Sequence, residues 1–217
     1  MITTLFLSVA LFAQDAAPSP EEASPPAEAA IEAPAFDTEA AIAGVNGWLN
    51  GIETYQARFD QIAPDGSASG GTLYIRRPGR LRFDYDAPSP LLVVADGTTV
   101  AIEDSALNTV DRVPLRSTPL WWLLKPDADL SEDARVTDVW TEDGRLYVGL
   151  ADANDEMDGQ ALFVFHPESY ALEEWFVSDS LGYTTRVILS EVETGMSLNP
   201  RLFILDEPEE DRRTRRQ

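Results

Sequence analysis

Regular alternation of apolar and polar residues between Gly70 and Pro90 constrains the fold of this chain more than any other feature. A period of two places apolar side chains on one face of a strand and polar ones on the other. Pro78 and Gly79 interrupt the alternation once, and Pro followed by Gly is a strong turn signal. The stretch therefore predicts an antiparallel hairpin with one buried and one solvated face. Its apolar positions are Leu73, Ile75, Leu81, Phe83 and Tyr85.

Similar short segments, separated by turn signals such as Asp96-Gly97 and Asp143-Gly144, fill most of the chain from residue 55 onward. Hairpin connections between successive strands build an antiparallel sheet. The predicted fold class is therefore mainly β (α+β), with one curved antiparallel sheet or unclosed barrel of about 11–12 strands and a few short helices. Strands are expected near residues 55–62, 71–77, 80–85, 91–96, 99–104, 109–113, 135–141, 145–151, 160–165, 171–178, 184–192 and 202–205.

A helix is predicted from Thr38 to about Gly51, capped by Asp37 or Thr38. Its apolar residues recur at helical spacing and form one stripe. Glycines at 44, 47 and 51 each cost about 1 kcal/mol relative to alanine, so this helix depends on what its stripe packs against. That dependence suits a movable lid, and plain core packing explains the stripe equally well. The stripe consists of Ile42, Val45, Trp48, Leu49 and Ile52.

A second, intensely apolar helix is predicted between Pro119, which suits the first helical position, and Pro126, which ends it. It contains adjacent tryptophans, Trp121 and Trp122. Neighbouring residues on a helix point in different directions, so at least one of the two rings needs a second apolar surface. Residues 129–133 are expected to add another helical turn.

The two ends of the chain differ in composition from its middle. Residues 1–13 are expected to be an export signal, because the apolar run Leu5–Ala13 is too short to span a bilayer. Residues 14–36, rich in Ala, Pro and Glu, are expected to form a disordered linker. A single folded domain is assigned to residues 37–208, followed by a charged tail at 209–217.

Charge and cysteine content exclude several classes of protein. The formal net charge of −22 opposes binding to nucleic acid and to anionic membrane surfaces, although solubility or a salty habitat accounts for it equally well. The absence of cysteine excludes a disulfide scaffold, a zinc–thiolate site, a cysteine nucleophile and a lipid anchor on this chain.

Residues that could support catalysis are sparse. His166 is the only histidine, and a general base here would act almost alone. Residues 66–70 lack the serine of a nucleophile elbow, because Ala68 occupies its position. The acidic stretch at residues 152–159 is not a calcium loop, because its sixth position is not glycine and Phe163 occupies the twelfth position, which needs a bidentate glutamate. We therefore expect that the chain is not an enzyme and that it binds no metal and no cofactor.

Apolar surface is the chemistry that remains. If the sheet curves, one of its faces lines a concavity that the two predicted helices could cover. From composition alone, a filled core under two helices is the favoured interpretation. The candidate lining residues are Leu73, Ile75, Phe83, Val93, Val100, Ile102, Leu146 and Val148, with Leu81 and Leu150 beside them.

Five segments occur in order along the chain: Tyr55–Gln61, Gly71–Pro78, Leu81–Tyr85, Val94–Gly97 and Thr118–Leu120. Together they resemble the LolA family of periplasmic lipoprotein carriers, and the resemblance covers residues 37–208. It implies an unclosed barrel whose helices form a lid over a lipid cavity. It also implies a soluble monomeric chaperone with acylated lipoproteins as cargo and an inner-membrane ABC lipoprotein-releasing complex as partner. Whether an outer-membrane acceptor exists stays open.

The same resemblance assigns roles to particular residues. Arg77 matches the family arginine that bonds to lid-helix backbone and holds the empty form closed. Trp48, Leu49, Trp121 and Trp122 are expected in the lid. Leu81 matches a position implicated in docking to the releasing complex.

Two other functions are alternatives to lipoprotein carriage. A carrier or sensor of another amphiphile, such as a glycolipid, would use the same fold. An enzyme acting on lipids is disfavoured, because the chain lacks a recognisable nucleophile or metal-ligand set.

Overall fold

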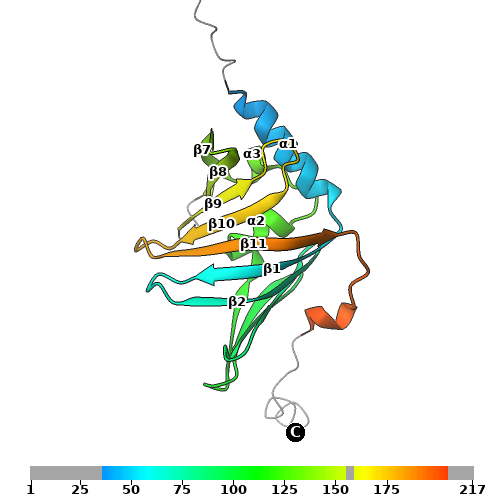
Figure 1. Ribbon diagram of the computed structural model, residues 1–217, viewed down its shortest axis with the longest axis vertical. Coiled ribbons are helices and arrows are strands. Elements are labelled where there is room, and N and C mark those ends of the chain that lie inside the picture. Colours follow the sequence, from blue (N-terminus) through cyan, green and yellow to red (C-terminus); the bar gives the residue numbers. More distant parts are fainter. Residues whose placement is uncertain (1–35, 155–158, 205–217) are drawn as a thin grey trace, which may run out of the picture. The chain divides into compact units, whose positions relative to one another are not determined.

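The computed structural model describes residues 36–154 and 159–204. The predicted signal, linker and charged tail lie outside these residues, apart from Phe36 at the end of the linker. Eleven strands form one antiparallel sheet in the order β6-β5-β4-β3-β2-β1-β11-β10-β9-β8-β7 (Figure 1). The strands are β1 Thr54–Ile62, β2 Ala68–Arg76, β3 Arg80–Tyr85, β4 Leu91–Asp96, β5 Thr99–Asp104, β6 Thr109–Pro114, β7 Arg135–Glu142, β8 Arg145–Ala151, β9 Gln160–Phe165, β10 Leu172–Ser178 and β11 Thr184–Thr194.

The sheet is an open meander whose two edges are consecutive in the sequence. β1 pairs with β11 in the middle, and β6 and β7 are the edges. The chain between those two edges carries the 3-10 helix η1 (Leu115–Ser117) and the helices α2 (Leu120–Leu124) and α3 (Leu130–Asp133). The predicted unclosed antiparallel architecture is therefore confirmed, and the short helices connect its two free edges.

Helix α1 (Thr38–Gly51) has the predicted bounds, and the side chain of Asp37 caps it by accepting a hydrogen bond from Ala40 N at 3.0 Å. Its buried residues include Ile42, Val45 and Leu49, which belong to the predicted stripe. No helix among the described residues is long and apolar enough to cross a membrane.

The three glycines of α1 differ in their surroundings. A Cβ at Gly44 would lie 2.2 Å from the ring of Tyr170, whereas a Cβ at Gly47 would meet nothing within 4 Å. Tyr170 has φ +56° in the turn between β9 and β10 and packs against the core. Gly44 is therefore needed for a close approach between α1 and this turn, which helix propensity alone does not reveal.

We expect Gly44→Ala and Gly47→Ala to change stability in opposite directions. Gly47→Ala should stabilise the protein by about 0.5–1 kcal/mol, because an exposed helix interior prefers alanine. Gly44→Ala should destabilise it by about 1 kcal/mol or more, because the Tyr170 ring must move. Urea unfolding of both variants measures this difference. Higher stability of both variants would show that the Tyr170 ring can move away from position 44 without a loss of stability.

The last predicted strand, at residues 202–205, is wrong. Residues Pro200–Phe203 form the 3-10 helix η2, and the side chain of Asn199 accepts a hydrogen bond from Arg201 N at 3.0 Å. Asparagine before proline is a helix-start signal, whereas the apolar run after it resembled a short strand. Phe203 is buried, and η2 packs beside β3 and β4.

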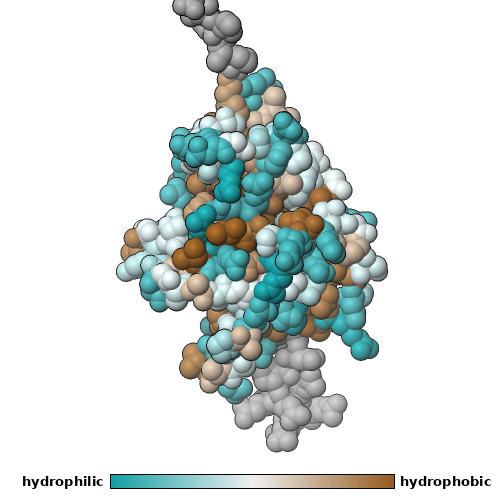
Figure 2. All heavy atoms as spheres, viewed as in Figure 1, coloured by the Kyte–Doolittle hydropathy of each residue, from teal (hydrophilic) through white to brown (hydrophobic). Residues whose placement is uncertain are grey.

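The outer face of the sheet contains a buried carboxylate. Glu174 of β10 is 2% exposed and pairs with Arg186 and with Arg145, whose Nη1 lies 3.1 Å from Glu174 Oε2. Two cations therefore compensate the cost of burying this charge. Figure 2 shows that hydrophilic side chains dominate the visible face and that hydrophobic ones gather toward its middle. A hollow of about 290 Å³ on the outer face is lined by residues that include Trp140, Gly149, Leu162 and Phe176.

Candidate functional site

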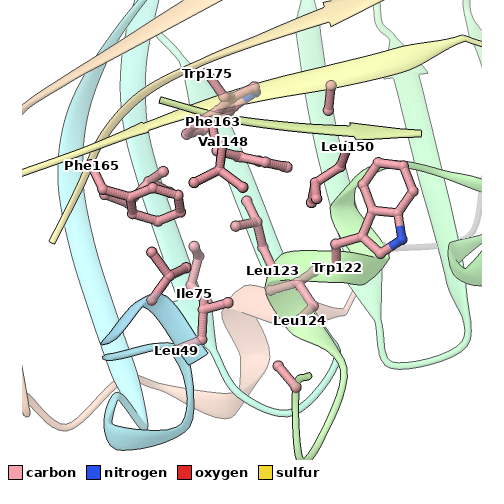
Figure 3. Close-up of a cluster of buried hydrophobic side chains, with 14 of the residues drawn as sticks. Leu49, Ile75, Trp122, Leu123, Leu124, Val148, Leu150, Phe163, Phe165 and Trp175 are labelled. Atoms are coloured by element: carbon pink, nitrogen blue, oxygen red, sulfur yellow. The ribbon is translucent and has the colours of Figure 1, made fainter. Parts of the chain in front are cut away.

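Helices α1 and α2 cover the inner face of the sheet with apolar side chains. Leu49 of α1 and Trp122, Leu123 and Leu124 of α2 are each at most 4% exposed. Figure 3 shows these side chains pointing toward those of the strands. The interior is therefore filled by the helices in this conformation. The strand residues labelled in the cluster are Ile75, Val148, Leu150, Phe163, Phe165 and Trp175.

Strand register shows which predicted lining residues share this inner face. Leu73 pairs with Phe83, and Ile75 pairs with Leu81, so these side chains point the same way. Val93 lies opposite Phe83 and is half-buried against the core. Whether these side chains line an acyl-chain cavity remains a prediction. The buried residues of the predicted set are Leu73, Ile75, Phe83, Val100, Leu146 and Val148.

Ile102, another predicted lining residue, differs from these residues in its exposure. It pairs with Val93 and therefore points to the same side of the sheet, but it is 39% exposed. Strand β5 is one strand from the β6 edge, where Val113 is equally exposed. The inner face thus continues toward this edge beyond the part that is buried. Ile102 lies on the rim of the predicted lining rather than inside it.

Leu81, the predicted docking residue, lies on the inner face of β3. Its side chain is fully buried, and the residue pairs with Ile75 and Ala95. Docking to a partner through this side chain is not available in the closed conformation. A glutamate at this position would place an unpaired carboxylate in the core. Loss of uptake by Leu81→Glu would therefore report a lost fold rather than a lost docking contact.

The aromatic residues expected in the lid occupy different environments. Trp48 is half-buried and makes edge contacts with Tyr55 and Phe165, with ring centroids 6.1 Å and 6.3 Å away. Trp122 is 1% exposed, whereas Trp121 is half-buried, with the Arg116 guanidinium 4.8 Å from its ring. The adjacent tryptophans therefore use two surfaces, as their helical spacing requires.

The turn between β2 and β3 holds both covering helices. Arg77 donates from Nη1 to the carbonyl of Leu49, near the end of α1, and from Nη2 to the carbonyl of Lys125, just after α2. Gly79 N donates to the carbonyl of Leu124 at 2.8 Å. Carbonyls at helix C-termini lack partners within the helix. One turn of the sheet therefore supplies hydrogen-bond donors to carbonyl groups at the C-terminal ends of two helices.

Burial affects the pKa of Arg77. Desolvation lowers the pKa of its guanidinium, and nearby Asp127 partly opposes this shift. A half-buried guanidinium makes strong hydrogen bonds, because water competes poorly for its N–H groups. The contacts of Arg77 therefore favour the closed arrangement of the helices.

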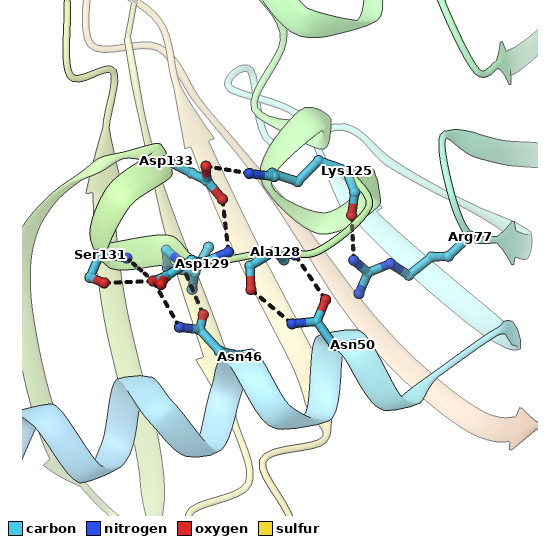
Figure 4. A network of polar contacts seen from close by, with 9 residues as sticks. Asn46, Asn50, Arg77, Lys125, Ala128, Asp129, Ser131 and Asp133 are labelled. Atoms are coloured by element: carbon cyan, nitrogen blue, oxygen red, sulfur yellow. Dashed lines mark hydrogen bonds and ion pairs between the residues drawn. The ribbon is translucent and has the colours of Figure 1, made fainter.

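A second polar network joins α1 to the segment before and within α3 (Figure 4). Asn50 Nδ2 donates to Ala128 O, and its Oδ1 accepts from Ala128 N, both at 2.8 Å. Asn46 Nδ2 donates to Asp129 Oδ1 at 3.1 Å, and its Oδ1 accepts from Leu130 N at 3.0 Å. Sequence reasoning missed both asparagines. Their spacing of four on a predicted helix, beside its apolar stripe, was the available signal.

Further contacts hold the chain from α2 to α3 together. Lys125 Nζ pairs with Asp133 Oδ1, and Asp133 Oδ2 accepts a hydrogen bond from Asp129 N at 2.8 Å. The hydroxyl and backbone N–H of Ser131 both donate to Asp129, and these bonds lower the pKa of the Asp129 carboxyl. A hollow of about 510 Å³ lies beside this network, lined in part by Ile42, Ala43 and Val136.

Searches for similar proteins agree with one another. The family model of the outer membrane lipoprotein carrier protein LolA matches residues 50–206. The outer-membrane lipoprotein carrier protein of Methylococcus capsulatus is 31% identical over 170 residues, covering 74% of this chain and 81% of that protein. The carrier protein of the same name from Nitrosomonas europaea is 28% identical over 178 residues, covering 78% and 86%.

One solved structure reaches a TM-score of 0.50. It is a Vibrio parahaemolyticus domain assigned to outer membrane lipoprotein sorting, with 13% identity, and the match covers 75% of this chain and 94% of that one. Identity this low supports the shared fold alone.

Proposed function

The chain belongs to the LolA family of outer membrane lipoprotein carrier proteins, and from that premise we propose that it is a periplasmic lipoprotein chaperone. It binds the acyl chains of lipoproteins released from the inner membrane and delivers them to the outer membrane. Carriage of this kind involves no covalent step and no cofactor.

The observation that carries this proposal is the apolar lid over an apolar sheet face. Leu49, Trp122 and Leu123 are buried against side chains that an acyl chain could contact equally well. Each CH₂ moved from water to an apolar site contributes about 0.8 kcal/mol, so a sixteen-carbon chain gains roughly 12 kcal/mol. Acyl chains can therefore replace the lid side chains when the lid opens.

Release requires that the closed, empty form competes with the loaded form. A carrier whose empty form is well packed binds its cargo less tightly, because binding must first expose that packed interior. The contacts from Arg77 to Leu49 O and Lys125 O, and from Gly79 N to Leu124 O, stabilise the closed form. We infer that this turn is the latch that sets cargo affinity.

The proposed cycle begins and ends at membranes. Residues 1–13 act as an export signal, and an inner-membrane ABC complex loads the carrier. Delivery to an outer-membrane acceptor is the expected last step, with the carrier acting as a monomer. The high negative charge of the chain disfavours retention on anionic lipid surfaces.

The test uses the mature chain, from about Gln14, mixed with spheroplasts that synthesise labelled lipoproteins. Soluble one-to-one complexes of carrier and lipoprotein are expected, and a variant that lacks residues 38–51 should form none. Lipoproteins that stay wholly on the inner membrane, although the added protein is folded, would contradict the proposal. Lipid that co-purifies with the protein would then identify another amphiphile as the ligand.

A further inference from the structure

The polar contacts of the lid fall into two groups that do different work. One group joins the lid to the sheet through Arg77 and Gly79. The other joins α1 to the segment from Ala128 to Leu130 through Asn46 and Asn50. We call this second group the asparagine clasp.

Each asparagine of the clasp uses both polar groups of its side chain. Asn50 donates to the carbonyl of Ala128 and accepts from its N–H, whereas Asn46 donates to the Asp129 carboxylate and accepts from the N–H of Leu130. Ala128 and Leu130 are 3% and 1% exposed, so parting the two segments would uncover apolar side chains and break the four hydrogen bonds of the clasp.

The α2–α3 segment is itself held together by charged side chains. Lys125, which directly follows α2, pairs with Asp133 at the end of α3, and Asp133 also accepts from Asp129 N. Asp129 in turn accepts from Asn46. A continuous set of polar contacts therefore runs from α1 through α3 to the end of α2 (Figure 4).

We propose that the asparagine clasp makes α1 and the α2–α3 segment a single lid that opens and closes as one body. The clasp stays formed throughout the cycle, and the contacts of Arg77 and Gly79 are those that break. Asn46 and Asn50 are thus positioning residues that present the carbonyls of Leu49 and Lys125 to Arg77 together. This inference rests on the proposed carrier function, because it concerns how the cargo site opens.

The test makes the clasp covalent. Because the chain has no cysteine, Asn50→Cys with Ala128→Cys introduces a single possible disulfide. The hydrogen bonds between Asn50 and the backbone of Ala128 make these two positions neighbours, and a disulfide between them requires a Cα–Cα separation of about 4.4–6.8 Å. The oxidised full chain should take up a labelled triacylated lipopeptide within about twofold of its reduced form, since no required motion is blocked.

A loss of about tenfold or more on oxidation, recovered on reduction, would overturn the single lid. The single variants Asn50→Cys and Ala128→Cys, treated with the same oxidant, control for damage that is unrelated to the bridge. The wild-type chain in the same assay tests the carrier function separately. If it takes up no lipopeptide, the proposed function fails; if only the bridged protein fails, the single lid is wrong.

A distance measurement checks the inference without relying on the disulfide. Spin labels on cysteines placed at the exposed positions Gly47, Glu132 and Asp60 report α1, α3 and the sheet. On lipopeptide binding, the distance from 47 to 60 should lengthen and that from 47 to 132 should stay constant. Lengthening of both distances would show that the two segments part. A constant 47–60 distance would show that the lid does not open, and either result overturns the proposal.

Discussion

Arg77→Leu is expected to yield a carrier that takes up lipoproteins and releases them poorly. The substitution removes the hydrogen bonds to Leu49 O and Lys125 O that stabilise the closed form. Hydrogen bonds from a charged donor contribute about 1.5–3 kcal/mol each. Losing two of them shifts the balance toward the open form by about 3 kcal/mol or more, so cargo should be held roughly 100-fold more tightly.

The measurement is the rate at which a bound, labelled lipopeptide leaves the purified variant for acceptor vesicles. Arg76→Leu is the matched control, because Arg76 lies next to Arg77 but makes none of these contacts with the lid. Arg77→Lys should fall between wild type and Arg77→Leu, since one ammonium cannot reproduce the planar fork of a guanidinium. Transfer of the lipopeptide by Arg77→Leu at the wild-type rate would show that Arg77 does not act as the latch.

Trp122→Ala is expected to destabilise the protein much more than Trp121→Ala. The Trp122 side chain is 1% exposed within the cluster of Figure 3, and truncating a buried tryptophan costs about 3–5 kcal/mol. Trp121 is half-buried and has Arg116 over its ring, so its loss should cost about 1 kcal/mol.

Denaturant unfolding of the two variants measures this difference directly. The pair is well matched, since the residues are adjacent, chemically identical and on the same short helix. Equal losses of stability would show that α2 does not pack as closely on the sheet as the buried side chains indicate. A smaller loss at Trp122, with the sheet still intact, would show that the lid opens independently of global unfolding.

Prediction from the sequence succeeded where the signal is local. The hairpin from β2 to β3 follows from alternation and the Pro78-Gly79 turn, and α1 follows from its cap and apolar stripe. The strand predicted at residues 202–205 failed, because an apolar run is ambiguous at that length and the stronger Asn199-Pro200 signal was overlooked.

Which side chains meet across the sheet could not be predicted in the same way. Ile102 and Leu81 both occupy apolar positions in strands that alternate apolar and polar residues. Ile102 nevertheless lies on the exposed rim, whereas Leu81 lies in the core. Their burial depends on how far each strand lies from the free edge and on what covers it. Strand order and the position of the lid set these distances, and neither can be predicted from the local alternation of apolar and polar residues.

The asparagines of the clasp illustrate the same limit. Asn46 and Asn50 belong to the predicted helix, and their partners at Ala128, Asp129 and Leu130 are 78 to 84 residues away in the sequence. Asparagine on a helix is usually solvated, so only the packing of the two segments assigns these side chains a partner.

By itself, the sequence determined the periodicity of the strands, the bounds of α1 and the turn that carries Arg77. Each of these follows from interactions between residues close along the chain. Only the tertiary structure decided that Arg77 and Gly79 reach two helices, that the asparagines join those helices, and that Leu81 is buried. These outcomes depend on pairings between segments far apart in the sequence, which arise only when the sheet curves and the lid closes on it.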